Sequence, residues 1–215
     1  MFTDATIQQD IEKELIWDPG INANHAAITV RNGIATLAGA VDSYWERCAA
    51  ERAAWRIAHV KGVVNTLRVN PPFEFERADD DITLAAMSLL EWNAVVPQSV
   101  EVQTNGGCVT LSGTVTWNYQ RETAEQALIG LIGIKGIKNE IKLAPAPATA
   151  DARLPIEEAF KRSALIDSSH IKAHVTHGSV SLRGTARTHA EHVEAIHAAW
   201  SSPGLSQVED HIAIA

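Results

Sequence analysis

The stretch GGCVTLSGTV, residues 106–115, decides the fold because two other parts of the chain repeat it, GIATLAGAV at 33–41 and GSVSLRGTA at 178–186. In each copy a second glycine follows the first after six residues, with a leucine between them. These positions are Gly33, Leu37 and Gly39; Gly107, Leu111 and Gly113; and Gly178, Leu182 and Gly184. Self-similarity at a fixed period is the signature of a repeat architecture.

The similarity continues beyond the second glycine into a segment with helical spacing and then into a strand. Alanines recur three residues apart on the expected helix: Ala50 and Ala53, Ala124 and Ala127, Ala195 and Ala198. A closing strand matches in all copies, as Val63-x-Asn65-x-Leu67-x-Val69, Ile137-x-Asn139-x-Ile141-x-Leu143 and Val208-x-Asp210-x-Ile212-x-Ile214. Three tandem modules therefore make up the chain.

Each module is expected to fold in the order helix, strand, strand, helix, strand. Apolar residues at helical spacing precede the motif, for example Ile7, Ile11 and Leu15, and strands alternate between apolar and polar residues. The glycine after the first strand is expected to form a hairpin turn. The fold class is α+β: three tandem αββαβ modules, each a small three-stranded mixed sheet packed under two helices.

Proline-rich stretches separate the modules. PPFEFERA (71–78) and APAPATA (144–150) favour extended spacers. We therefore expect domains at 1–70, 77–144 and 150–215.

The modules resemble the BON domain, named for bacterial osmotically inducible and nodulation proteins, on the motifs quoted above. TWNYQRETAEQAL (116–128) and IWDP (16–19) look like the soluble, three-copy members of that family. The resemblance implies a non-enzymatic role in bacterial osmotic or envelope stress. For this family phospholipid binding is the usual proposal.

Charge and composition exclude some kinds of partner. The formal net charge is −8, so we expect no nucleic-acid partner. No run of about 18 apolar residues occurs, which excludes a transmembrane segment. The N-terminus does not read as a secretory signal, and Cys48 and Cys108 lie in different modules. We expect a cytoplasmic protein; the alternative is periplasmic, if a signal peptide has been removed.

The segment ALIGLIGI, residues 127–134, is too apolar for a helix that buries one face on a small sheet. A surplus apolar face implies a second burial partner. The favoured interpretation is packing against the other modules or against a second chain, which would make a homo-oligomer. The alternative is a partner or lipid surface formed by Ile129, Ile132, Ile134 and Trp117, with a lipid or an amphipathic peptide as its occupant.

Histidine gathers in the third module, which holds seven of the nine. His189 and His192 stand three residues apart on a helix and are weak candidates for metal ligands. Solvated surface histidines are the competing interpretation, and a cluster that titrates near pH 6 is another. We expect no cofactor.

Tryptophans recur at matching positions. Trp17 and Trp92 near the end of the first helix, and Trp55 and Trp200 on the second, are interpreted as packing anchors. Trp45 and Trp117, near the start of the second helix, could instead be exposed and stack with Tyr44 or Tyr119.

Motifs for catalysis are missing: the sequence contains neither GxGxxG nor GxxxxGK[ST], nor an EF-type loop. We therefore expect no enzyme but a bacterial stress-associated binding or scaffold protein that acts through the surfaces of its modules. Peripheral phospholipid binding is one alternative. The other is a structural oligomer in which the second helix of module two is the internal seam.

Overall fold

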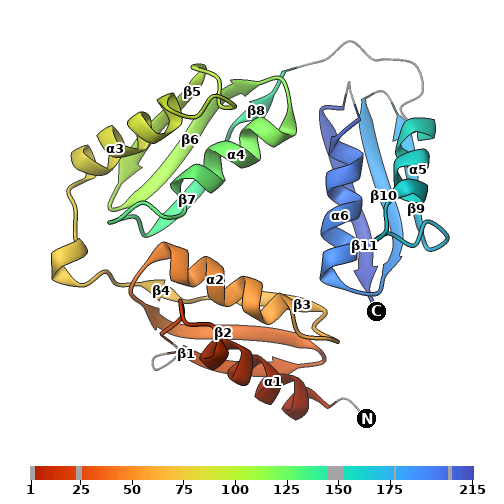
Figure 1. The fold of residues 1–215 in the computed structure, drawn as a ribbon, viewed down its shortest axis with the longest axis horizontal. Coiled ribbons are helices and arrows are strands. Elements are labelled where there is room, and N and C mark those ends of the chain that lie inside the picture. The colour runs from red at the N-terminus through yellow and green to blue at the C-terminus, as the bar shows by residue number, and fades with distance from the viewer. Residues whose placement is uncertain (1–2, 23–25, 145–152, 177, 203–204) are drawn as a thin grey trace. The chain divides into compact units, whose positions relative to one another are not determined.

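The computed structural model describes residues 3–22, 26–144, 153–176, 178–202 and 205–215. Two compact units make up the chain, Met1–Lys142 with the first two repeats and Leu143–Ala215 with the third. Each repeat is a small α+β module (Figure 1), as the sequence predicts.

The elements follow the same order in every repeat. Repeat 1 contains α1 (Asp4–Trp17), β1 (Ala26–Arg31), β2 (Ile34–Val41), α2 (Tyr44–Trp55), β3 (Gly62–Asn65) and β4 (Arg68–Val69). After the short 3₁₀ turn η2 (Phe73–Phe75), repeat 2 contains α3 (Asp79–Glu91), β5 (Val100–Asn105), β6 (Cys108–Val115), α4 (Asn118–Leu128), β7 (Gly136–Asn139) and β8 (Lys142–Leu143). Repeat 3 contains α5 (Arg153–Arg162), β9 (Ile171–Thr176), β10 (Ser179–Ala186), α6 (His189–Trp200) and β11 (Gln207–Ile214).

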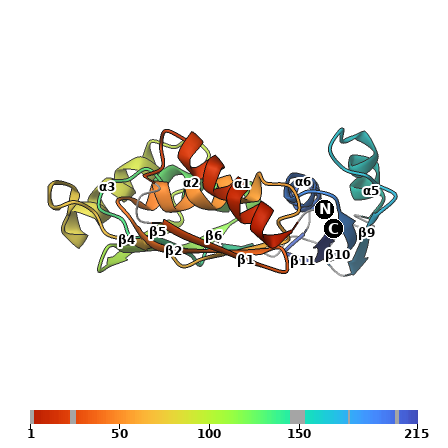
Figure 2. The ribbon, with the colours of Figure 1, turned by 90° about the horizontal axis from the view of Figure 1, so that it is seen from below.

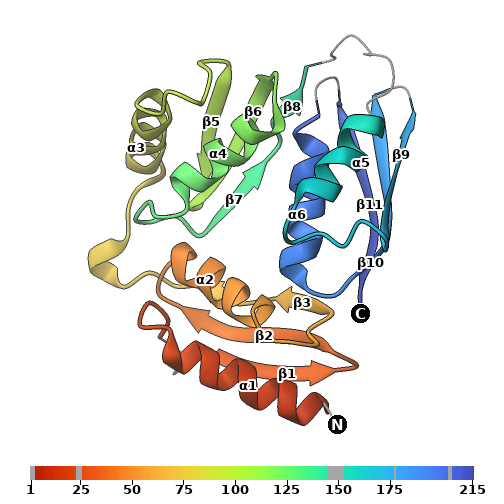
Figure 3. The same cartoon turned by 45° about the vertical axis from the view of Figure 1, so that its right-hand side comes forward.

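The strand that carries the quoted motif is the middle strand of each sheet. β2 pairs antiparallel with β1 and parallel with β3, and β6 and β10 do the same in their repeats. Figure 3 shows β10 between β9 and β11 in the third repeat. The sheets are therefore mixed.

The closing strand is interrupted in two repeats. In repeat 1 it divides into β3 and β4, both paired with β2, and repeat 2 divides in the same way. In repeat 3, β11 is continuous over eight residues. The sequence pattern predicts one strand in each repeat, so it is wrong about this interruption.

The first glycine of the motif makes the hairpin turn. Asn32 and Gly33 have φ values of 53° and 78°, and Gly106 and Gly107 have 59° and 79°. Two consecutive positive φ values define the type I′ turn, whose twist matches the flanking strands. A carboxylate at the start of the first helix also holds this turn: Asp79 accepts hydrogen bonds from the Gly106 and Gly107 amides at 2.7 and 2.8 Å.

The second glycine is required by a close approach of two strands. Gly113 has φ +117°, and a side chain there would collide with the carbonyl of Ser99. Gly184, at φ +142°, is blocked in the same way by the carbonyl of His170. Only glycine satisfies both the backbone conformation and the contact.

Both helices of a repeat cover the same face of its sheet. Figure 2 shows α1 and α2 on one side of β1 and β2. Ile11, Leu15 and Leu37 are completely buried between these layers. Phe160 and Ile156 of α5 fill the corresponding core of repeat 3. On the opposite face of each sheet, which we call its open face, described side chains such as Thr29, Glu101 and Arg183 are exposed.

Candidate functional site

Helix α4 ends at Leu128, and residues 129–134 form a loop rather than a continuation of the helix. The expectation that ALIGLIGI lies on the second helix is therefore wrong beyond its first two residues. Gly133 adopts φ +92°, which lets the chain turn back into β7.

The loop differs from its counterpart in repeat 1, which is held to the first helix by ion pairs. There Arg56 follows α2 and binds Glu14 at 2.8 Å and Asp18 at 3.2 Å, joining the ends of both helices. In repeat 2 the matching residue is Gly130, which has no side chain to make these bonds.

Three isoleucines of this loop have different surroundings. Ile132 is 50% exposed, whereas Ile134 is only 1% exposed, and Ile129 is intermediate. The prediction that Ile134 belongs to an outward surface is corrected, because this side chain packs in the core. The alignment of the repeats could have shown that Ile134 is buried, because Val60 and Leu205 occupy the same position and are only 3% and 7% exposed.

Ile129 and Ile132 line a pocket of about 320 Å³ within the first unit. Its walls come from the 129–134 loop, the start of α2 and the linker that joins the two repeats. The lining residues are Asp42, Ser43, Trp45, Pro71, Phe75, Ile129, Gly130, Leu131, Ile132, Gly133 and Ile134. We call this set the loop pocket. Its volume is within the range of small-ligand sites.

Trp45 provides the largest ring of the loop pocket and is positioned by a glycine. A side chain at Gly20 would collide with its indole, so the absence of a Cβ lets the ring lie there. Trp45 remains 41% exposed and Phe75 44% exposed. Two half-exposed aromatic rings thus face a mostly aliphatic loop, an arrangement suited to an apolar partner group.

Trp117 lies outside the loop pocket. Its ring stacks on Tyr119 with centroids 6.5 Å apart and planes inclined by 23°, as one sequence interpretation expects. It is 37% exposed.

The first helices present a second set of exposed apolar side chains. Trp17 and Trp92 are 83% and 86% exposed, so neither indole anchors the core of its repeat and that prediction is wrong. Leu84 and Met87 on α3 are 67% and 53% exposed. By contrast, Trp55 and Trp200 pack against their cores.

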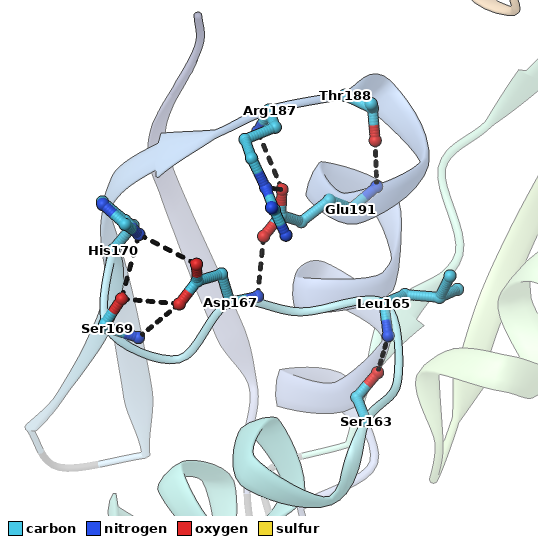
Figure 4. A network of polar contacts seen from close by, with 8 residues as sticks. All are labelled: Ser163, Leu165, Asp167, Ser169, His170, Arg187, Thr188 and Glu191. Atoms are coloured by element: carbon cyan, nitrogen blue, oxygen red, sulfur yellow. Dashed lines mark hydrogen bonds and ion pairs between the residues drawn. The ribbon is translucent and has the colours of Figure 1, made fainter.

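A buried carboxylate at the start of the second helix is a structural feature that sequence reasoning missed. Glu191 is 3% exposed and accepts hydrogen bonds from the amides of Asp167 and Arg187 at 2.7 and 2.8 Å. Its own amide donates to Thr188 (Figure 4). Glu46 holds Asn22 and Asp42 in the same way. The spacing Ser43-x-x-Glu46 and Thr188-x-x-Glu191 is the capping-box signature that could have revealed it.

The loop that contains Asp167, whose amide donates to Glu191, also has polar contacts between its own side chains. Figure 4 shows Asp167 turned toward Ser169 and His170. The hydroxyl of Ser169 is the main cause that lowers the pKa of Asp167, and the His170 ring lies 3.2 Å from the same carboxylate.

His189 and His192 have ring centroids 6.0 Å apart. The Nε2 atom of His192 lies 2.7 Å from Asp210, so it is already used within the repeat. Within the described residues, no group of three or more histidine, cysteine or acidic side chains is arranged to hold a metal ion.

Tyr44 and Cys48 lie one turn apart on α2, where burial governs their ionisation. Burial is the main cause that raises the pKa of Tyr44 to about 12 and also raises the pKa of the Cys48 thiol. A thiol with a raised pKa is a poor nucleophile at neutral pH.

Among the described helices, none combines the length and apolar character needed to cross a membrane.

Comparisons with known proteins agree with the repeat structure. The BON domain matches three times, at residues 3–71, 78–145 and 149–215. An uncharacterized protein in the gshII 5′ region of Anaplasma centrale is 31% identical over 140 residues, which cover 64% of this chain and 80% of that protein.

Two solved structures are similar at 14% identity. Both are CdsD, a structural protein of the type III secretion system of Chlamydia trachomatis. The first covers 95% of this chain and 90% of that one with a TM-score of 0.26. The second, its C-terminal domain, covers 100% of both with a TM-score of 0.27. The family matches span nearly the whole sequence, and the chain belongs to the BON family as a member with three consecutive domains.

Proposed function

We propose that this protein is a non-enzymatic, stress-associated binding or scaffold protein whose contact site is the loop pocket. The carrying observation is the exposed apolar lining, with Ile132, Trp45 and Phe75 each more than 40% exposed. Water in contact with such surface is unfavourable, so burying it against a partner contributes binding free energy. The occupant is an apolar side chain of a protein segment.

The carboxylate of Asp42 refines this proposal. Asp42 is exposed at the rim of the loop pocket, while its backbone amide is held by Glu46. A segment that places a lysine or arginine beside its apolar anchor would gain an additional charge contact.

The test uses the full chain with 8-anilinonaphthalene-1-sulfonate as an apolar probe. We expect wild type to bind the dye saturably and Ile132→Asp to reduce binding about tenfold, because a charge in the pocket is costly to desolvate. The matched control is Leu165→Asp, in repeat 3, where Leu165 is 56% exposed. Equal dye binding by wild type, Ile132→Asp and the control would refute the proposal, provided that circular dichroism shows all three folded.

A second candidate function, peripheral phospholipid binding, is favoured by exposed Leu84, Met87 and Trp92 on and after α3. Three aspartates open the same helix and would be repelled by anionic lipid. Co-sedimentation of Leu84→Asp with neutral and anionic vesicles tests this candidate. Light scattering of Ile132→Asp tests the other alternative, a structural oligomer that buries the loop pocket between copies of the chain.

A further inference from the structure

The open face of the third sheet carries two neighbouring cations and a histidine. Arg183 in the middle strand lies opposite Lys172 of β9 on one side and opposite His211 of β11 on the other. All three side chains are exposed, on the face away from the helices. Lys172 and Arg183 form a positive pair in a chain whose net charge is −8.

This arrangement does not stabilise the sheet. Like charges placed directly opposite each other on neighbouring strands are destabilising. Within the described part of the chain, neither Lys172 nor Arg183 forms an ion pair with a carboxylate. The two cations are therefore left without internal compensation.

Lys172 and Arg183 both line a hollow of about 530 Å³. Its lining is Glu157, His170, Lys172, Ala173, His174, Ser181, Arg183 and Gly184. The hydroxyl oxygen of Ser181 is buried there and has no hydrogen-bond partner among the described residues. An unsatisfied buried hydroxyl is costly, and a ligand oxygen could accept a hydrogen bond from it.

The other two repeats show that the fold does not require these cations. The positions matching Lys172 and Arg183 are Ala27 and Ala38 in repeat 1. In repeat 2 they are Glu101 and Ser112. The same strand pairing thus carries neutral, acidic or basic side chains, and the basic set belongs to repeat 3 alone.

We propose that the open face of the third sheet binds an oxyanion of the phosphate type. Lys172 and Arg183 are the charged anchors, and the Ser181 hydroxyl is a neutral donor. The planar guanidinium of Arg183 can hold two phosphate oxygens at once, while the ammonium of Lys172 acts as a point charge. This site is in a different repeat from the loop pocket and does not depend on it.

The carboxylates near the site define its limits. Glu157 of α5 lines the hollow. Glu209 lies opposite Ser181, where it contacts His211 at 4.0 Å and accepts from Gln207 at 3.4 Å. These groups favour a compact anion that approaches the Lys172 and Arg183 pair over a broad polyanion that would also meet both acids.

Calorimetric titration of the full chain with pyrophosphate tests the site. We expect saturable binding that weakens as salt is added. Each of Lys172→Gln and Arg183→Gln should lower the affinity about tenfold or more, because charge-assisted hydrogen bonds are lost. Ser181→Ala should lower it by a smaller factor.

The control removes equal charge from strands of repeat 1. Arg31 and Arg68 are exposed strand cations, so R31Q/R68Q changes the net charge as much as K172Q/R183Q does. Anionic phosphatidylglycerol vesicles, with phosphatidylcholine vesicles as reference, form the second arm. Loss of binding in K172Q/R183Q but not in R31Q/R68Q supports the proposal. Binding of pyrophosphate identifies a soluble phosphate as the ligand, and binding of the phosphatidylglycerol vesicles identifies a lipid headgroup. The proposal fails if wild type binds neither probe, or if both double variants lose binding equally.

Discussion

Repeats 1 and 3 hold their third strand to the second helix by different chemistry. In repeat 1 the amide of Asn65 donates to the Arg47 carbonyl at 3.0 Å and to Glu51 at 3.1 Å. In repeat 3 the matching residue is Asp210, which lies 2.7 Å from the Nε2 atom of His192.

The residues on the third strand and on the second helix differ together between the two repeats. An ionised carboxylate only accepts hydrogen bonds, so Asp210 cannot donate to a carbonyl as Asn65 does. His192, at the position of Arg47, supplies the donor instead. Asn65 and Asp210 nevertheless share one role. Each side chain accepts a hydrogen bond from the backbone amide two residues later, at 3.2 Å in repeat 1 and 3.0 Å in repeat 3. The difference teaches that the backbone frame is common, while the polar pair that joins strand to helix can be replaced as a unit.

The largest effect should come from breaking the common frame in one repeat. Gly184→Ala places a Cβ against the His170 carbonyl at φ +142°, which we expect to cost about 3 kcal/mol or more through strain and overpacking. Native-state amide hydrogen exchange should show lost protection in repeat 3, with repeat 1 unchanged.

The control for this change is Gly62→Ala in repeat 1. An added Cβ there would meet Ile34 at an ordinary 3.6 Å, so protection should change little. Equal losses from both substitutions would contradict the steric requirement at the second glycine.

A smaller effect should come from the buried carboxylate that the two repeats share. Glu46→Ala and Glu191→Ala each leave backbone amides without their acceptor, and we expect about 2–3 kcal/mol lost in the affected repeat. The same exchange measurement should give similar values for both.

Gln120→Ala is the comparison for these variants. Gln120 occupies the matching position of repeat 2 and accepts from the Thr116 and Trp117 amides at 3.1 Å, in an exposed setting. A loss near 1 kcal/mol is expected. A loss as large as that of Glu46→Ala would show that burial of the carboxylate is not what makes the contact strong.

The smallest effect should come from exchanging the polar pair itself. Asp210→Asn alone removes the carboxylate partner of His192 and should cost about 1 kcal/mol. Adding His192→Arg recreates the repeat 1 combination and should recover most of that loss. A double-mutant cycle measures the coupling; purely additive effects would mean that the pair does not act as a unit.

The repeat frame could be predicted from the sequence because it depends on local requirements. Gly33 and Gly107 mark a turn with positive φ, and the alternation around Leu37 and Leu111 places one strand face in a core. These constraints act over a few residues, and three copies repeat them. The BON resemblance and the α+β class both follow from that pattern.

The candidate site could be predicted only in part. The surplus of apolar residues around Ile129 and Ile132 pointed to the segment that lines the loop pocket, although α4 stops before both. The aromatic wall could not be anticipated, since Trp45 and Phe75 are distant in sequence and meet the loop only in the folded unit. The exposure of Trp17 and Trp92 was also missed, because recurrence at matching positions does not reveal which face of a helix is covered.

The sequence by itself determined the number of modules, the order of their elements and the position of each hairpin turn, because backbone conformation and hydrophobic alternation are short-range properties. Tertiary structure alone decided which apolar side chains stay exposed, how Asp210 finds His192, and that Lys172 lies opposite Arg183. These features depend on strand register and on contacts between residues far apart in the chain. Strand register and long-range contacts are established only when the sheet forms, so the sequence pattern alone does not reveal them.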